Sequence, residues 1–225
     1  MRKLITGGTI VNEGRAFEGA IVIEDETIVE IIDGDLVPRG TFDETIDATG
    51  CFVMPGIIDT HVHFREPGME EKATIDTEST AAVFGGVTSF IEMPNTNPQT
   101  TSLEALNDKL ARAKRSSHVN YSFFFGATNA NADIIKQLDV HSVPGVKLFM
   151  GASTGNMLVD RPNALDNVFD AAAKMNFPVM THCEDSGIIN ENMKAAKAKY
   201  GDDPSIIHHC EIRSEEACWQ SSRLA

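Results

Sequence analysis

The chain has 225 residues, of which 42% are hydrophobic and 23% charged, proportions typical of a globular protein and not of a disordered one. Acidic residues outnumber basic ones, 33 Asp and Glu against 19 Lys and Arg, which gives a formal net charge of −14. This charge repels a phosphate backbone, so we expect no nucleic-acid partner. A small anionic metabolite can bind only where a local positive charge, such as a metal ion, reverses the field.

The same inventory favours a cytoplasmic protein. No apolar run approaches the roughly 18–20 residues of a membrane-spanning helix, so we expect no membrane partner. The first residues, MRKLITGGTIVNEG, lack the apolar core of a secretion signal. The four cysteines form no CxxC pair and no dense disulfide framework, which is typical of thiols in a reducing compartment.

Residues 1–54 show the pattern of a small β layer. Short apolar stretches alternate with turn residues, at 4–5, 10–11, 20–23 and 27–32. We interpret Gly7-Gly8, between the first two stretches, as a turn, because it lacks the spacing of a phosphate-binding loop. A separate N-terminal β domain over residues 1–54 is therefore predicted.

After Pro55 the pattern changes to alternating strands and helices. Strands are predicted near residues 57, 87, 119, 145 and 177, and helices over 76–84, 103–114, 133–138 and 164–175. Repeated βα units predict a parallel sheet, either doubly wound or closed as a barrel. A barrel of eight units takes about 250 residues, more than 55–225 provides, and the last residues have a helical pattern without a cap. We therefore expect that the chain is truncated inside a helix, or that further strands come from elsewhere.

His61 and His63 form an HxH pair where the first of these strands ends. Residues two apart on a strand point to the same side, so both imidazoles can reach one metal ion. In a barrel, the carboxyl ends of the strands form the face where the chemistry takes place. The alternative is a pair of surface histidines in a turn.

Two further residues strengthen the metal interpretation. His182 ends another predicted strand, and Lys147 lies within the apolar stretch 144–151. A buried lysine is costly unless it is paired or neutralised, and as a neutral amine it becomes reactive. The alternative for Lys147 is a side chain that extends along the strand to reach solvent.

Four motifs carry a resemblance to a known family: GIIDTHVHFREPG at 56–68, FIEMPNTNP at 90–98, GVKLFMG at 145–151 and MTHCED at 180–185. Together they resemble the amidohydrolase superfamily and, within it, most of all the dihydroorotases. The resemblance implies an α/β fold, a (β/α)8 TIM-type barrel over 55–225 of which only about the first five strands are present. It also implies that the N-terminal layer belongs to a small β-sandwich.

The resemblance also implies a site with two zinc ions. His61 and His63 match the pair of histidines on the more buried metal. Lys147 matches a lysine that carbon dioxide converts to a carbamate bridging both metals, and His182 matches a ligand of the second metal. Metal coordination lowers the pKa of a bridging water, so that hydroxide forms near neutral pH.

Arg65 and Asn95, together with His63, match residues that bind substrate in dihydroorotases. A guanidinium suits bidentate capture of a carboxylate, and an amide offers both a donor and an acceptor to a cyclic amide. The alternatives are an ion pair of Arg65 with Glu66 or Glu70, and a simple turn role for Asn95.

The chain departs from the family pattern in what it lacks. The remaining metal-binding histidine and the catalytic aspartate, the expected general base, would lie beyond Ala225. His208 and His209 precede a helix instead of ending a strand, so we interpret them as surface or structural residues. The sequence around Lys147 is also similar to that of hydantoinases and dihydropyrimidinases.

The resemblance implies the reversible cyclisation of N-carbamoyl-L-aspartate to dihydroorotate, in pyrimidine biosynthesis, by a hydroxide that two metals activate. The alternatives are another cyclic amidohydrolase (an allantoinase, hydantoinase or dihydropyrimidinase) or a non-catalytic scaffold. Arg65 discriminates among the enzymes, because dihydroorotate carries a free carboxylate and a neutral cyclic amide does not. The expected partner is a small anionic substrate, and the oligomeric state, homodimer or other, is left open.

Overall fold

The computed structural model describes residues 1–34, 36, 38–151 and 157–225. Contacts between residues divide the chain into two compact units, Met1–Ile57 and Ile58–Ala225. Each unit has its own buried apolar cluster, so each is described separately. No helix in the described ranges is long and apolar enough to cross a membrane.

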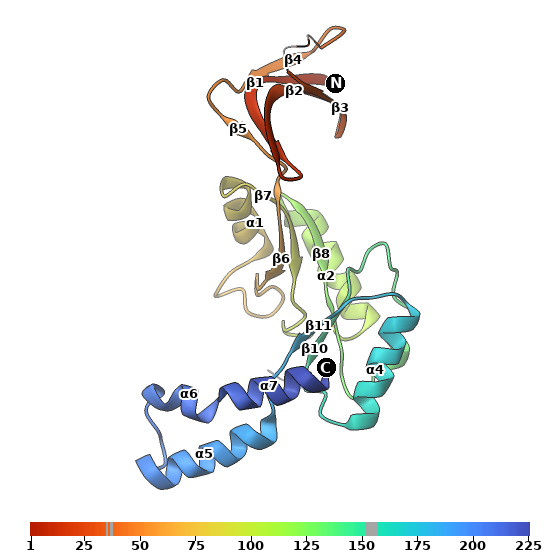
Figure 1. Cartoon of the computed structure of the whole chain (residues 1–225). Helices are drawn as coiled ribbons and strands as arrows, with labels where there is room; N and C mark the ends of the chain where they lie inside the picture. Colours follow the sequence, from red (N-terminus) through yellow and green to blue (C-terminus); the bar gives the residue numbers. More distant parts are fainter. Residues whose placement is uncertain (35, 37, 152–156) are drawn as a thin grey trace. The chain divides into compact units, whose positions relative to one another are not determined.

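The first unit is built on one sheet (Figure 1). Its strands are β1 (Arg2–Asn12), β2 (Arg15–Glu24), β3 (Thr27–Asp33), β4 (Glu44–Asp47) and β5 (Phe52–Val53). The order is β3-β2-β1-β4, with antiparallel pairing of β1–β2 and β2–β3, and both β4 and β5 are parallel to β1. Leu4, Ala20, Val22 and Ile32 form its buried cluster.

The predicted turn at Gly7-Gly8 is wrong, because both glycines lie inside the continuous strand β1. The register with β2 shifts between Thr6 and Gly8, and Gly7 has a φ of +80°, so the pair forms an irregularity of the β-bulge kind. A Cβ at Gly7 would lie 2.6 Å from Thr49 Oγ1. Glycine is therefore required here by a positive φ and by close packing. A positive φ is also common in turns, so the glycine pair by itself does not distinguish a turn from a bulge.

The second unit alternates strands and helices. Its strands are β6 (Ile57–Val62), β7 (Val87–Glu92), β8 (Asn120–Phe123), β9 (Phe125–Gly126), β10 (Val146–Phe149) and β11 (Val179–His182). They form two three-stranded sheets, β6-β7-β8 and β11-β10-β9, and the pairs β7–β8, β9–β10 and β10–β11 are parallel. The strands lie where the sequence predicts them, which confirms the α/β class.

One extended segment joins the two sheets, because only Phe124 separates β8 from β9. Phe124 donates its N–H to Glu92 O at the end of β7, whereas Phe125 donates to Gly145 O before β10. Spatial order across both sheets therefore follows chain order, from β6 to β11. Closure into an eight-stranded barrel and the β-sandwich remain predictions.

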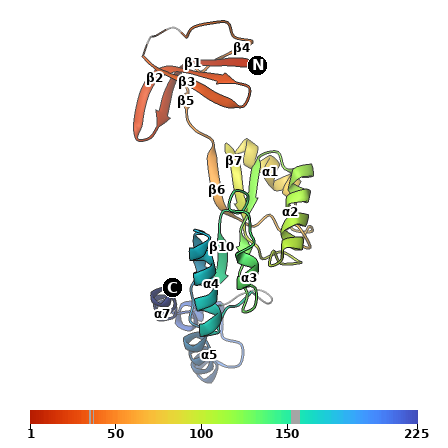
Figure 2. The same cartoon turned by 90° about the vertical axis from the view of Figure 1, so that its right-hand side faces the viewer.

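Helices connect the strands. They are α1 (Ile75–Phe84), α2 (Leu103–Ser116), α3 (Ala132–Ile135), α4 (Pro162–Lys174), α5 (Ser186–Tyr200), α6 (His209–Ile212) and α7 (Glu215–Leu224), with a short 3₁₀ turn η1 (Ile206–His208). Hydroxyl or carboxylate side chains cap α1, α2, α5 and α7, from Thr74, Ser102, Asp185 and Ser214. Helices α1 and α2 contact each other and lie against β7 and β8 (Figure 2).

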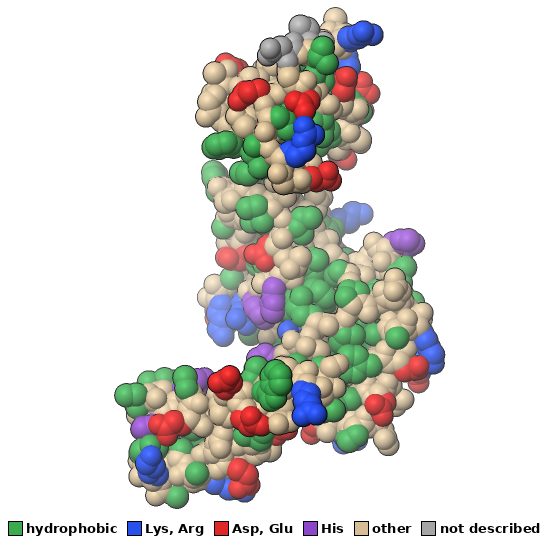
Figure 3. Space-filling model, in the orientation of Figure 1, with side chains coloured by type: hydrophobic (Ala, Val, Ile, Leu, Met, Phe, Trp, Pro, Cys, Tyr) green, Lys and Arg blue, Asp and Glu red, His purple; other side chains and the backbone are tan. Residues whose placement is uncertain are grey.

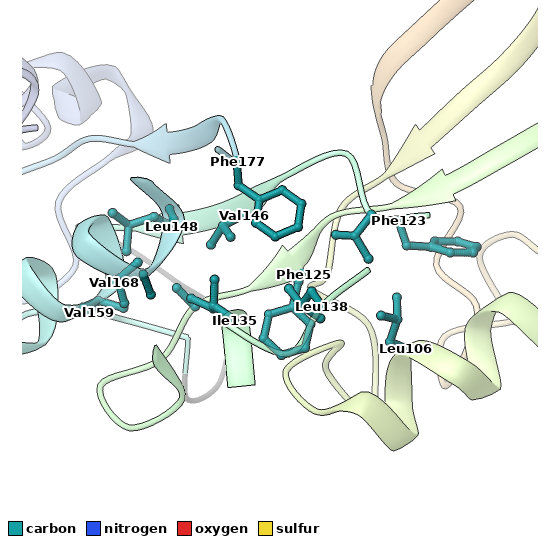
Figure 4. Packing of buried hydrophobic residues seen from close by; sticks show 14 of the residues in the cluster. Leu106, Phe123, Phe125, Ile135, Leu138, Val146, Leu148, Val159, Val168 and Phe177 are labelled. Atoms are coloured by element: carbon teal, nitrogen blue, oxygen red, sulfur yellow. The ribbon is translucent and has the colours of Figure 1, made fainter. Parts of the chain in front are cut away.

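The core of the second unit lies between the strands and the helices that cover them (Figure 4). Phe123 and Phe125 are fully buried on either side of the junction between the two sheets. Leu106 from α2 packs in the same cluster, as do Val146 from β10 and Val168 from α4. These contacts fix the strand ends, where the candidate site lies.

Candidate active site

His61 and His63 lie at the carboxyl end of β6, with ring centroids 5.4 Å apart. Partial burial of each ring lowers its pKa, although both residues are exposed as a whole. The charge of Lys147 lowers the pKa of His61 further, and Arg65 does the same for His63. Both imidazoles are therefore held in the neutral form that binds metals.

Lys147 occupies the middle of β10 and is only 3% exposed, which confirms that it is buried in an apolar strand. Its Nζ lies 5.0 Å from the centre of the Phe149 ring. Among the residues that the structure describes, none forms an ion pair or hydrogen bond with this amine. Burial lowers the pKa of Lys147, so the neutral amine is more accessible than in an exposed lysine.

His182 is the last residue of β11 and is paired in register with Phe149 of β10, its ring centroid 5.8 Å from the Phe149 ring. His182 and Lys147 both act electrostatically on His61, so the strand ends of β6, β10 and β11 face a common region. Figure 3 shows histidine side chains on one face near the ends of β6 and β11, with basic side chains beside them.

Asn95 follows β7 and contacts His63, with 3.0 Å between Asn95 Oδ1 and His63 Nδ1. An amide oxygen only accepts hydrogen bonds, so Nδ1 of a neutral His63 is the donor and Nε2 carries the free lone pair. Asn95 is therefore more than a turn residue: it orients a predicted metal ligand while its amide Nδ2 faces no partner in the described ranges.

Arg65 has an unusual backbone conformation, with a φ of +70°. Its N–H donates to Glu92 Oε1 at 3.1 Å, which holds the loop after His63. Glu66 and Glu70 instead contact Arg112, whose Nη1 is 3.4 and 3.9 Å from their carboxylates. Within the described part of the chain, the Arg65 side chain forms no ion pair, so the alternative of an Arg65 pair with either glutamate is wrong.

Glu92 belongs to a buried ion pair beneath this loop. Lys109 Nζ from α2 lies 2.8 Å from Glu92 Oε2, and both side chains are 1% exposed. Lys109 also donates to Met93 O at 3.1 Å, and its Nζ lies 4.8 Å from the Phe123 ring centre. Burial raises the pKa of Glu92 and lowers that of Lys109, while their attraction opposes both shifts.

Glu184 and Arg213 form a second ion pair near the site. Arg213 Nε donates to Glu184 Oε1 at 2.7 Å, and its Nη2 donates to Oε2. This fork lowers the pKa of Glu184. Glu184 Oε2 also lies 2.7 Å from His182 Nε2, so the carboxylate links the histidine to Arg213, which lies between α6 and α7.

The donor chemistry fits a pair of divalent cations only if Lys147 supplies an anionic ligand. Three neutral imidazoles compensate no positive charge, whereas a modified lysine adds an oxygen ligand with a negative charge. In the described ranges no three His, Cys, Asp or Glu residues are close enough to hold a metal by themselves. The structure thus brings the predicted residues to one region without forming a complete cluster of these four residue types.

Sequence reasoning missed four charged residues around the site: Glu92, Lys109, Glu184 and Arg213. A signal existed for Lys109, which lies on the same helical face as buried Leu106 and Ala113. It also existed for Glu184, two residues after His182, since residues two apart in an extended chain point the same way. His208 stacks on Tyr200 at 3.6 Å, consistent with a structural role.

A parallel α/β unit with histidines at its strand ends and a buried lysine between them is the arrangement that the sequence motifs associate with the amidohydrolase superfamily. The profile of the family described as "Amidohydrolase family" matches residues 52–214. Because this match covers most of the sequence, the chain belongs to the amidohydrolase family.

Several named proteins are similar to the chain. An allantoinase of Desulfitobacterium hafniense (strain Y51) is 36% identical over 194 residues, which are 84% of this chain and 42% of that protein. A dihydroorotase of Methanosphaera stadtmanae is 33% identical over 177 residues, 79% of this chain and 39% of its own length. The L-hydantoinase (dihydropyrimidinase) structure from Arthrobacter aurescens has a TM-score of 0.87 at 27% identity, covering 98% of this chain and 49% of that one.

The chain therefore spans less than half the length of each of these relatives. Their names divide among three cyclic amidohydrolase activities, so the comparisons support the family and leave the prediction of a dihydroorotase unresolved.

Proposed function

We propose that this protein hydrolyses a cyclic amide and that its substrate is dihydroorotate, formed reversibly from N-carbamoyl-L-aspartate. One observation carries the substrate assignment. Arg65 lies two residues after His63, and among the described residues its guanidinium forms no ion pair, since Glu66 and Glu70 contact Arg112 instead. A free carboxylate on the substrate is the group that this charge would bind.

The proposed cofactor is a pair of zinc ions held by His61, His63, His182 and a carbamate on Lys147. The carbamate forms when the neutral amine of Lys147 adds to carbon dioxide and releases one proton. When bound, the metals supply a polarised carbonyl and a water of lowered pKa. Lys147 is buried and has no carboxylate partner among the described residues, which supports this chemistry, because a salt-bridged ammonium could not react.

The remaining residues bind and orient the substrate. The Arg65 fork would bind the carboxylate by two parallel hydrogen bonds, and the free amide Nδ2 of Asn95 would donate to a ring carbonyl. Asn95 Oδ1 meanwhile keeps the proton of His63 on Nδ1. A general base and a further metal ligand would come from sequence outside these residues, in a cytoplasmic enzyme of pyrimidine biosynthesis.

An allantoinase or hydantoinase is the second candidate, favoured by the 36% identity to an allantoinase and the TM-score of 0.87 to a hydantoinase. The test is to load the full-length protein with zinc and measure kcat/KM for dihydroorotate, allantoin, hydantoin and dihydrouracil. We expect dihydroorotate to have the highest value. A preference for any of the three neutral amides would refute the dihydroorotase assignment. If none of the four substrates is hydrolysed, the proposal that the protein is a cyclic amide hydrolase is wrong.

A further inference from the structure

The side chains of Arg213, Glu184 and His182 form a chain of polar contacts that leads to the proposed metal site. Arg213 donates to both oxygens of Glu184, with Nε at 2.7 Å from Oε1, and Glu184 Oε2 lies 2.7 Å from His182 Nε2. Glu184 is 16% exposed and Arg213 is 32% exposed, so this contact is better shielded from water than the exposed ion pairs on the helices. Partial burial favours a fixed geometry over a fluctuating one.

The proton of His182 can be placed from this chemistry. A carboxylate that accepts two hydrogen bonds from a guanidinium is ionised and has no proton to donate. The short contact to His182 Nε2 therefore requires that Nε2 carries the proton and donates it to Glu184. In a neutral imidazole the other nitrogen then holds the lone pair, so His182 presents Nδ1.

The same reasoning assigns the opposite tautomer to His63. There Asn95 Oδ1 accepts from His63 Nδ1, which leaves Nε2 of His63 with the lone pair. The two histidines thus expose different nitrogens. Nδ1 is attached closer to the backbone than Nε2, so the choice of nitrogen decides how far from its strand a metal is held.

We propose that Glu184, clamped by Arg213, is a positioning residue that fixes the tautomer and ring orientation of His182, so that Nδ1 is the nitrogen offered to a metal ion. The inference rests on the proposed metal centre for its last step. Its first step, the fixed tautomer, is a property of the metal-free protein. Carboxylates that orient a metal-binding histidine typically change metal affinity by 10–100-fold when they are removed.

The first experiment is NMR of the metal-free full-length protein labelled with ¹⁵N in its histidines, at about pH 8, where an ordinary imidazole is neutral. The signals of His182 are assigned by their loss in His182→Asn. We expect protonated Nε2, unprotonated Nδ1, and an Nε2–H proton slow enough in exchange to be observed. In Glu184→Gln this proton should exchange too fast to be seen. A carboxylate can only accept, so it requires a proton on Nε2, whereas the glutamine amide can also donate and no longer imposes this requirement.

The second experiment measures zinc affinity by competition with a chelator. We expect Glu184→Gln to bind the weaker of the two ions about 10–100-fold less tightly, and Glu184→Asp and Arg213→Lys to lose less than this. The matched control is Glu191→Gln on α5, which removes the same charge from an exposed pair with Lys194. This control should leave both the His182 signal and the zinc affinity unchanged.

The two experiments separate failure of the inference from failure of the proposed function. A proton on Nδ1 of His182 in the wild-type protein would overturn the inference, whatever the protein binds. Unchanged zinc affinity in Glu184→Gln would also overturn it. A wild-type protein with the expected tautomer but no bound zinc would refute the proposed metal centre and support the positioning of the ring.

Discussion

Replacing Arg65 with alanine tests whether its guanidinium binds the substrate carboxylate. The change removes the side chain without altering the backbone requirement at this position, because arginine and alanine both carry a Cβ at a φ of +70°. The N–H that donates to Glu92 is also kept. Any loss of activity therefore reports on the guanidinium and not on the loop.

The size of the effect follows from the surroundings of the side chain. Glu66 and Glu70 contact Arg112, so within the described ranges the Arg65 guanidinium has no ion pair to break before it binds substrate. A hydrogen bond to a charged group contributes about 1.5–3 kcal/mol, and the partial exposure of Arg65 places it at the lower end. Two such bonds give about 3 kcal/mol, which corresponds to a loss of about 150-fold in kcat/KM.

The assay compares hydrolysis of dihydroorotate and dihydrouracil by the full-length enzyme. We expect the large loss for dihydroorotate only, since dihydrouracil has no carboxylate, and a partial recovery in Arg65→Lys, which lacks the planar fork. Arg115→Ala, which removes an exposed charge from α2, is the matched control and should change neither rate. Equal losses on both substrates would refute a role for Arg65 in specificity and favour a hydantoinase-like enzyme.

Three further predictions concern neighbouring groups. Lys147→Ala should lose both zinc and activity, and short carboxylic acids should restore part of the activity by replacing the carbamate; recovery with neutral amides of the same size would contradict this. Lys109→Met should lower the free energy of unfolding by about 3–5 kcal/mol, measured with guanidinium, because it leaves Glu92 buried and unpaired, whereas the double change with Glu92→Leu should cost less. The lowered pKa values of His61 and His63 mean that the unfolded chain takes up protons first as the pH falls. Their contribution to stability is therefore complete above about pH 6.5 and is lost as the pH falls through the lowered folded-state pKa values. Urea denaturation of the metal-free protein should show the free energy of unfolding decreasing over this pH range. In the variant with both His61→Ala and His63→Ala this decrease should be smaller.

The sequence predicted much of the second unit because its signals are local. The strand positions follow from apolar runs and turn residues, and HxH at the end of a strand follows from a period of two. The same local signals misled at Gly7-Gly8, where glycines are required by packing inside β1 and not by a change of direction. Glycine alone does not distinguish a bulge from a turn, because both use a positive φ.

The partners of the site residues were harder to predict because they depend on tertiary contacts. Glu92 meets Lys109 only when α2 packs on β7, and Glu184 meets Arg213 only when the chain returns after α5. Neither pairing has a fixed spacing that sequence could reveal. The burial of Lys147 could be predicted from its apolar neighbours, but its lack of a partner among the described residues required the structure.

The order of the strands in the second unit has a consequence for how the chain folds as it is synthesised. Strand β8 pairs with β7, which precedes it in the chain; β10 likewise pairs with β9, and β11 with β10. Strand β9 directly continues the segment of β8 after Phe124. Each new βα unit can therefore dock on an edge that has already left the ribosome, at the entropic cost of closing one loop. His61 is synthesised long before His182, so the metal ligands come together only as later units are added. We expect that shortened chains ending after β8 would already form the β7–β8 pair and bind no second metal ion.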